Sequence, residues 1–216
     1  LIGGLAGDAL TTGSNNVALG YGALSGEDAH SFNVAIGGYS LYNQNAGADA
    51  YNTAVGYNTG FAISTGVKNT IVGGLAGDSL TEGGENTALG YLALSAETKG
   101  DRNVAIGPYA LVSQNNTTNA DTYNTAVGYN AGASITTSIQ NTLIGGLAGD
   151  ALTTGFANVA VGYQALTNED ANGNNTALGY RSLKTLNAGS DAANTAVGYN
   201  SGTLMTTAVQ NTLIGS

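Results

Sequence analysis

Asn52-Thr53-Ala54-Val55-Gly56-Tyr57 is the stretch that decides the fold, because variants of it recur along the whole chain. Each variant has Asn, then Thr or Val, a third residue that is usually Ala, a branched apolar residue and Gly. This motif occurs at twelve places. They begin at Asn16, Asn33, Asn52, Asn69, Asn86, Asn103, Asn124, Asn141, Asn158, Asn175, Asn194 and Asn211.

The spacing of the motif predicts a parallel β-solenoid, an all-β fold. Successive motif asparagines are 17, 19 or 21 residues apart, which fits one solenoid coil and is too short for a helical pair or a propeller blade. The alternation of residues has period two, as a strand requires, whereas a helix would lose about 1 kcal/mol at each Gly. We therefore expect about twelve coils, each with two short strands (the second in runs such as 91–94), one tight corner and one looser corner.

The coils fall into four types that recur in the same order three times. Positions are counted from the motif asparagine as position 1, and the extra residues all lie in type 3. The longest coil predicts an outward bulge at 115–121. We expect a single repeat array over 1–216, with blocks 1–68, 69–140 and 141–210 and the start of a further coil at 211–216. Type 1 begins at Asn69, Asn141 and Asn211 (and is truncated at Leu1), type 2 at Asn16, Asn86 and Asn158, type 3 at Asn33, Asn103 and Asn175, and type 4 at Asn52, Asn124 and Asn194.

The four types predict complementary packing inside the solenoid. Position 9 is Leu in types 2 and 3 but Gly in types 1 and 4. Wherever position 9 is Gly, position 12 is a large apolar residue, as at Gly60 and Ile63. Position 3, usually Ala, is Ile or Leu in type 1. Since protein interiors are close-packed, we expect the large side chains to fill the space that the glycines leave.

Composition excludes several classes of function. The net charge is −9 with no basic stripe, which argues against nucleic acid and against anionic lipid as partners. No apolar run approaches the roughly 20 residues that span a bilayer. The absence of Cys removes thiol chemistry and thiolate metal sites. Because the chain starts and stops inside a repeat, we expect it to be a piece of a longer array.

The sequence predicts no enzyme, no cofactor and no metal site. The only His, His30, has no counterpart in the matching coils. The carboxylates occur once per coil type, and we interpret them as solvated turn residues rather than as a glycosidase-like pair. The run at 145–150 differs from the calcium-binding nonapeptide in the place of its third Gly and lacks the nine-residue period.

Two columns of side chains are the candidate interaction residues. We expect the twelve motif asparagines to form a structural ladder, since stacked uncharged amides can hydrogen-bond. Position 6 carries a tyrosine column that could pack between subunits or stack sugars, and packing is favoured because amphipathic rings suit interfaces. Thr at position 2 in eight coils leaves an ice-binding face as an alternative. The tyrosines are Tyr21, Tyr57, Tyr91, Tyr129, Tyr163, Tyr180 and Tyr199.

The motifs at 33–37 and 103–107 resemble the head repeat of YadA-like trimeric autotransporter adhesins, and 86–94 is similar to repeats of phage tail-fibre proteins. The resemblance implies a left-handed parallel β-roll, trimeric, exposed outside the cell or on a virion. We accordingly expect a structural extracellular fibre or adhesin segment that self-associates as a homotrimer or an end-to-end filament. Its partners would be itself and a host-surface glycan or protein. The alternative is a binding module with a repeated flat face for glycan or ice.

Overall fold

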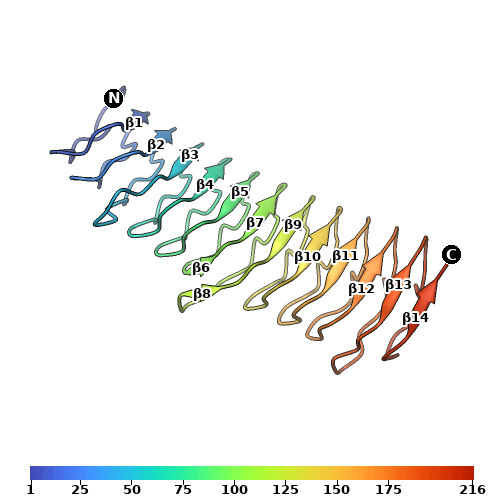
Figure 1. Ribbon diagram of the computed structural model, residues 1–216. Coiled ribbons are helices and arrows are strands. Elements are labelled where there is room, and N and C mark those ends of the chain that lie inside the picture. Colours follow the sequence, from blue (N-terminus) through green and yellow to red (C-terminus); the bar gives the residue numbers. More distant parts are fainter. The chain divides into compact units, whose positions relative to one another are not determined.

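The computed structural model describes residues 1–216 as two compact units of the same all-β architecture (Figure 1). Unit 1 comprises Leu1–Asn103 and Asn115–Asp121, and unit 2 comprises Val104–Gln114 and Thr122–Ser216. The division at 103/104 does not coincide with the block boundaries expected from the sequence. The structure contains no helix, and so none that could cross a membrane.

Each coil contributes one three-residue strand, and the strands within a unit pair in parallel with their sequence neighbours. The motif stays in register, as in Ala18 opposite Ala35 in unit 1 and Ala177 opposite Ala196 in unit 2. Unit 1 holds β1 (Val17–Leu19), β2 (Val34–Ile36), β3 (Thr53–Val55), β4 (Thr70–Val72) and β5 (Thr87–Leu89), with the two-residue β6 (Gly100–Asp101) and β8 (Ala120–Asp121). Unit 2 holds β7 (Val104–Ile106), β9 (Thr125–Val127), β10 (Thr142–Ile144), β11 (Val159–Val161), β12 (Thr176–Leu178), β13 (Thr195–Val197) and β14 (Thr212–Ile214). The predicted parallel β-solenoid of about twelve coils is confirmed.

One side of each strand faces the interior of the coil, and the other side faces outward. Position 3 points inward and is fully buried at Ala54, while Thr53 and Val55 on either side are partly exposed. The predicted complementary packing is confirmed. A side chain placed on Gly60 would meet Ile63 Cδ1 at 2.9 Å, and one placed on Gly149 would meet Leu152 Cδ1 at 2.8 Å. Large side chains therefore occupy the space that these glycines leave open.

The prediction of a second strand in each coil is wrong. In the run 91–94, Leu92 and Leu94 take left-handed φ angles of 56° and 55°, and the same two positions are left-handed in the other coils. Such alternation excludes a strand and costs about 1–2 kcal/mol per residue. It is offset because these turns still hydrogen-bond from coil to coil, as from the Leu92 amide to the Gly74 carbonyl at 3.2 Å.

The predicted outward bulge at 115–121 is wrong in part. Residues 117–119 are exposed, but the segment is tied back to the preceding coil on both sides of them. Asn116 is buried and donates to both carboxylate oxygens of Glu97, each at 2.9 Å, and β8 pairs with β6. The extra residues thus supply hydrogen bonds that the shorter type 3 coils lack.

The corner glycine at position 5 should tolerate no side chain. Gly162 has φ +135°, and a Cβ there would lie 2.4 Å from the Gly179 carbonyl oxygen of the next coil. We expect Gly162→Ala to lower the free energy of unfolding by more than about 3 kcal/mol, through backbone strain and a clash that pushes two coils apart. Gly189→Ala is the matched control, since its φ is +71° with open space around it, and should cost about 1 kcal/mol. Urea denaturation followed by circular dichroism measures both, and equal losses would contradict this account.

Candidate functional site: the asparagine column and the outer strand face

The motif asparagines form a continuous column of hydrogen bonds inside each unit. The side-chain Oδ1 of Asn141 accepts from the backbone amide of Asn158 in the next coil at 2.9 Å, and its Nδ2 donates to the Gly155 carbonyl at 3.0 Å. Ten such amide-to-Oδ1 bonds run from coil to coil at 2.8–3.2 Å. Only a primary amide offers both a donor and an acceptor on a side chain this short. The column therefore holds the corner before each strand.

Type 3 coils interrupt the second half of this pattern. Eight motif asparagines donate to the carbonyl fourteen residues ahead, but Asn33 and Asn175, both in type 3 coils, do not. In two of the three type 3 coils a buried glutamine bonds to the asparagine of the following coil: Gln44 Oε1 accepts from Asn52 Nδ2 at 2.6 Å, and Gln114 Oε1 accepts from Asn124 Nδ2 at 3.0 Å.

A second interior column, at position 12, is the feature that sequence reasoning missed. It is Leu, Glu, Gln and Ile in coils of types 1 to 4 in the first two blocks. The sequence analysis took Glu27, Glu97 and Glu169 for solvated turn residues, and this is wrong, since all three are fully buried. The signal was available, because position 12 in coils of types 1 and 4 had already been assigned to the interior.

The three buried glutamates are bonded to very different extents. Glu97 Oε1 accepts from the amides of Thr98, Lys99 and Gly100 at 2.8–3.1 Å, in addition to the bonds from Asn116. Glu169 Oε1 accepts three bonds, two of them from Asn172, while its Oε2 makes no hydrogen bond of ordinary geometry.

Burial raises the pKa of the Glu169 carboxyl, and bonds from Asn172 offset only part of that effect. Burial likewise raises the pKa of Asp78 and of Asp150, which the sequence analysis also took for solvated.

The structure places every predicted tyrosine of position 6 at the surface. Exposed fractions run from 37% at Tyr180 to 60% at Tyr199. In unit 2 three successive rings stack, with centroids 5.7 Å apart between Tyr163 and Tyr180 and 5.3 Å apart between Tyr180 and Tyr199. The rings present their polar ends and part of each face to solvent, which suits either a subunit contact or a flat ligand.

The outer strand face adds a second apolar column beside the tyrosines. Position 4 points outward and carries Leu, Ile or Val, with Leu178 44% and Ile144 39% exposed. Position 2, outward on the same strands, is Thr or Val. On the strands themselves, only the Thr column was predicted as a regular outward feature. Contiguous apolar surface of this kind marks an interaction site more often than scattered apolar residues do.

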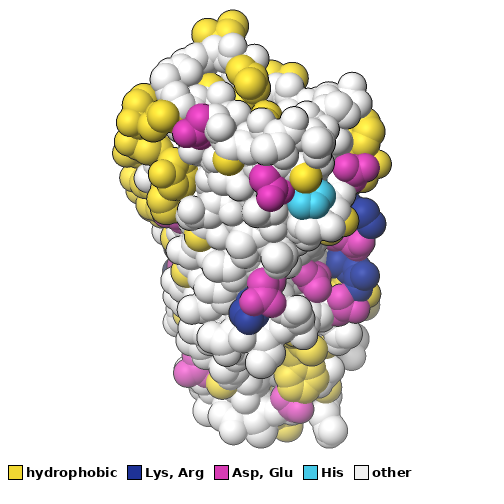
Figure 2. All heavy atoms as spheres, turned by 90° about the vertical axis from the view of Figure 1, so that its left-hand side faces the viewer, with side chains coloured by type: hydrophobic (Ala, Val, Ile, Leu, Met, Phe, Trp, Pro, Cys, Tyr) yellow, Lys and Arg dark blue, Asp and Glu magenta, His cyan; other side chains and the backbone are white.

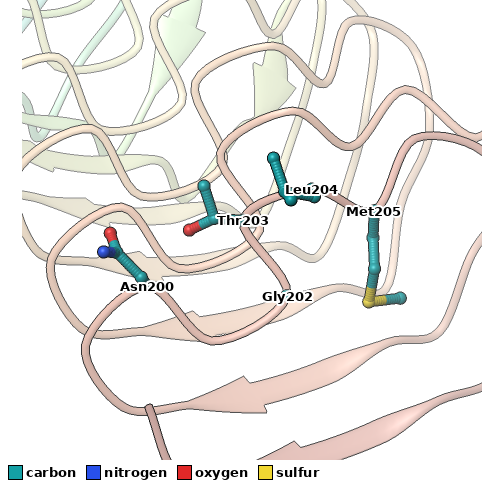
Figure 3. A pocket seen from close by; sticks show the side chains of 5 residues that line it. All are labelled: Asn200, Gly202, Thr203, Leu204 and Met205. Carbon is teal, nitrogen blue, oxygen red and sulfur yellow. The ribbon is translucent and has the colours of Figure 1, made fainter.

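Neither the charged corner nor the hollow at the last coil forms a site. Lys68 and Arg102 pair with Glu85 at 3.5 and 2.9 Å in unit 1, where they are exposed and contribute little to stability. A hollow of about 560 Å³ lies at the last coil (Figure 3), lined by Asn200, Gly202, Thr203, Leu204 and Met205. Met205 stands at position 12, so the hollow exposes the interior column itself.

Comparisons with protein-family models, curated proteins and solved structures found no match for this chain.

Removing one asparagine of the column should be costly. Asn141→Ala leaves the Asn158 amide without a partner, whereas the Gly155 carbonyl keeps the bond from the Ser138 hydroxyl, and one buried orphan costs about 1–3 kcal/mol. We expect a loss of about 1–3 kcal/mol in urea unfolding. Asn168→Ala, at an exposed asparagine of unit 2, should stay within about 0.5 kcal/mol. Similar losses in the two variants would show that the column does not hold the coils together.

The buried carboxyl of Glu169 should make the stability of the folded chain depend on pH, with a definite sign. Because its folded pKa is raised, Glu169 binds its proton more tightly in the folded chain. Its contribution to stability is fully present below the unfolded pKa of about 4.3 and is lost as pH rises through the folded pKa. We expect the melting temperature of Glu169→Gln minus that of wild type to increase from pH 4 to pH 8. A difference that stays constant or falls would be inconsistent with a raised pKa.

Proposed function

We propose that this chain is a structural segment of an extracellular fibre or adhesin, a stiff element that associates with copies of itself through its outer strand face. The single observation behind the proposal is the outward column of Leu, Ile and Val at position 4, adjoined by the exposed tyrosines of position 6. Strand faces that meet only water normally carry polar residues outward. Here the outward columns at positions 4 and 6 are apolar or weakly polar, which favours their burial against another copy of the chain.

The rest of the chain supports a mechanical role. The coils are held by backbone bonds and by the asparagine column, which repeat without interruption within each unit. Solenoids of this kind gain stability from nearest-neighbour contacts and present one surface many times over. The resemblance to adhesin heads and tail-fibre repeats supports an extracellular setting and a trimeric or filamentous assembly.

A second candidate is a binding module that takes glycan on the tyrosine column. The observation that favours it is the exposure of the tyrosine column, from 37% at Tyr180 to 60% at Tyr199, since exposed aromatic rings can pack against sugar rings. The association proposal explains more of the surface, because it also accounts for the apolar residues of position 4.

Substituting the tyrosines of one face distinguishes the two proposed functions. We expect Tyr163→Ser/Tyr180→Ser/Tyr199→Ser to raise the dissociation constant for self-association by about 30-fold or more, since each buried tyrosine can be worth about 2 kcal/mol. Sedimentation equilibrium measures this. The matched control is Tyr51→Ser/Tyr123→Ser, two tyrosines 53% and 48% exposed that stand outside the column.

Unchanged association in the triple variant, or a wild-type chain that stays monomeric at high concentration, would overturn the proposed function. Loss of glycan-array binding by a triple variant whose association is intact would instead support the binding module.

A further inference from the structure

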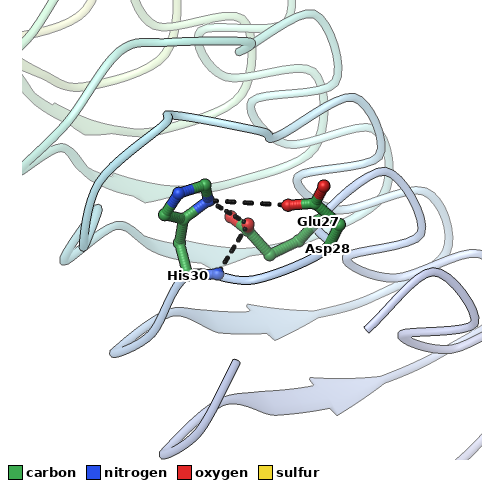
Figure 4. Close-up of side chains that lie close together, drawn as sticks. All are labelled: Glu27, Asp28 and His30. Atoms are coloured by element: carbon green, nitrogen blue, oxygen red, sulfur yellow. Dashed lines mark hydrogen bonds and ion pairs between the residues drawn. The ribbon is translucent and has the colours of Figure 1, made fainter. Parts of the chain in front are cut away.

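The only histidine of the chain stands beside two carboxylates in the type 2 coil of unit 1 (Figure 4). His30 Nδ1 lies 2.8 Å from Glu27 Oε1 and 3.8 Å from Asp28 Oδ1. One ligand atom from each of the three residues can be chosen so that all lie within 4.8 Å of one another. The group is reachable from solvent, because Asp28 is 52% and His30 17% exposed, and the imidazole is visible at the surface next to acidic side chains (Figure 2).

Glu27 supplies a further observation that favours a cation at this site. It is fully buried, and both of its hydrogen bonds come from His30 to Oε1, so that Oε2 has no partner. Glu169 of the third block likewise has no partner on Oε2, whereas Glu97 of the second block accepts bonds on both oxygens. The difference arises because Asn116, which saturates Glu97, is replaced by Ala46 in the coil that follows Glu27.

The chemistry of the three ligands selects the ion. Imidazole nitrogen with carboxylate oxygen suits first-row transition metals and Zn²⁺, whereas Ca²⁺ and Mg²⁺ take oxygen alone. Nδ1 and Oε1 lie 2.8 Å apart, joined by a hydrogen bond through one proton. A metal at about 2.0–2.2 Å from each ligand would replace that proton and would need the two atoms to separate by only about half an ångström.

We propose that Glu27, Asp28 and His30 bind one divalent transition-metal ion, with Zn²⁺ as the probe. The ion displaces the proton between Nδ1 and Oε1 and gives the buried carboxylate a cationic partner. Water takes the remaining coordination position of the ion. Binding releases a proton and therefore weakens as pH falls.

The third block contains a natural control for this site. Its residues 169–172 are Glu-Asp-Ala-Asn, where residues 27–30 are Glu-Asp-Ala-His. Asn172 Nδ2 donates to Glu169 Oε1 at 2.7 Å, in the place that His30 Nδ1 takes at Glu27. The two sites differ in whether the partner of the glutamate has a nitrogen lone pair to offer, because an amide nitrogen is a donor only.

Exchanging these two residues tests the proposal in both directions. Isothermal titration of Zn²⁺ into protein freed of metal with a chelator, at pH 7.5, should give one site for wild type. We expect His30→Asn to weaken binding by more than about 100-fold, since even outer-shell partners are typically worth 10–100-fold. Asn172→His should create a second site. Asp170→Asn, at the counterpart of Asp28, should leave the single site unchanged.

The melting temperature of each variant with chelator present checks that it folds. If His30→Asn fails to fold, the stoichiometry of Asn172→His still decides the matter. Wild type without a Zn²⁺ site, equal affinity in wild type and His30→Asn, or a single site in Asn172→His would overturn the proposal.

Discussion

The hydrogen bond from a motif asparagine's backbone amide to the side-chain oxygen of the preceding asparagine is the interaction on which the structure depends. Each coil is too short to bury a core alone, with one three-residue strand and an interior lined mainly by alanine. Coils must therefore be held at a fixed distance and register by polar contacts as well as apolar ones. The column does this at the corner where the strand begins, and its Nδ2 group fixes the end of the same coil. Asparagine satisfies both ends with one side chain.

This constraint explains why the remaining sequence can vary so freely on the outside. Position 7 holds Leu, Tyr, Asn, Gln, Arg or Gly, and all of these residues take left-handed φ. The strain is tolerated because each turn is bonded to the coils on either side. Inside, the room is so limited that a large residue at one position requires Gly at another, as with Leu143 and Gly149. We therefore expect function to be carried by the outward columns of side chains and by side chains at individual corners.

The sequence was sufficient for the fold, the register and the internal packing, because a two-residue alternation interrupted by Gly every seventeen residues admits few structures. It was insufficient for the second half of each coil. A run such as 91–94 reads as a strand from its apolar alternation, and only the left-handed angles at Leu92 and Leu94 show that it is a turn. The prediction from the sequence also put the buried glutamates at the surface. Glu27 looks like a surface residue among polar neighbours, whereas its position in the coil, shared with Leu and Ile in other types, puts it inside.

The outer surface was predicted less well than the interior for a physical reason: exposed side chains are set by partners that the chain alone does not specify. The tyrosine column was found from its spacing, while the apolar fourth position was taken for an ordinary strand residue.

The central claim, that the asparagine column joins each coil to the next, is tested most directly by amide hydrogen exchange. The account predicts that the Asn158 amide, which donates to a side chain, exchanges as slowly as the Val159 amide, which donates to the Asn175 carbonyl. Exchange at Asn158 as fast as at exposed Ser190 would contradict it.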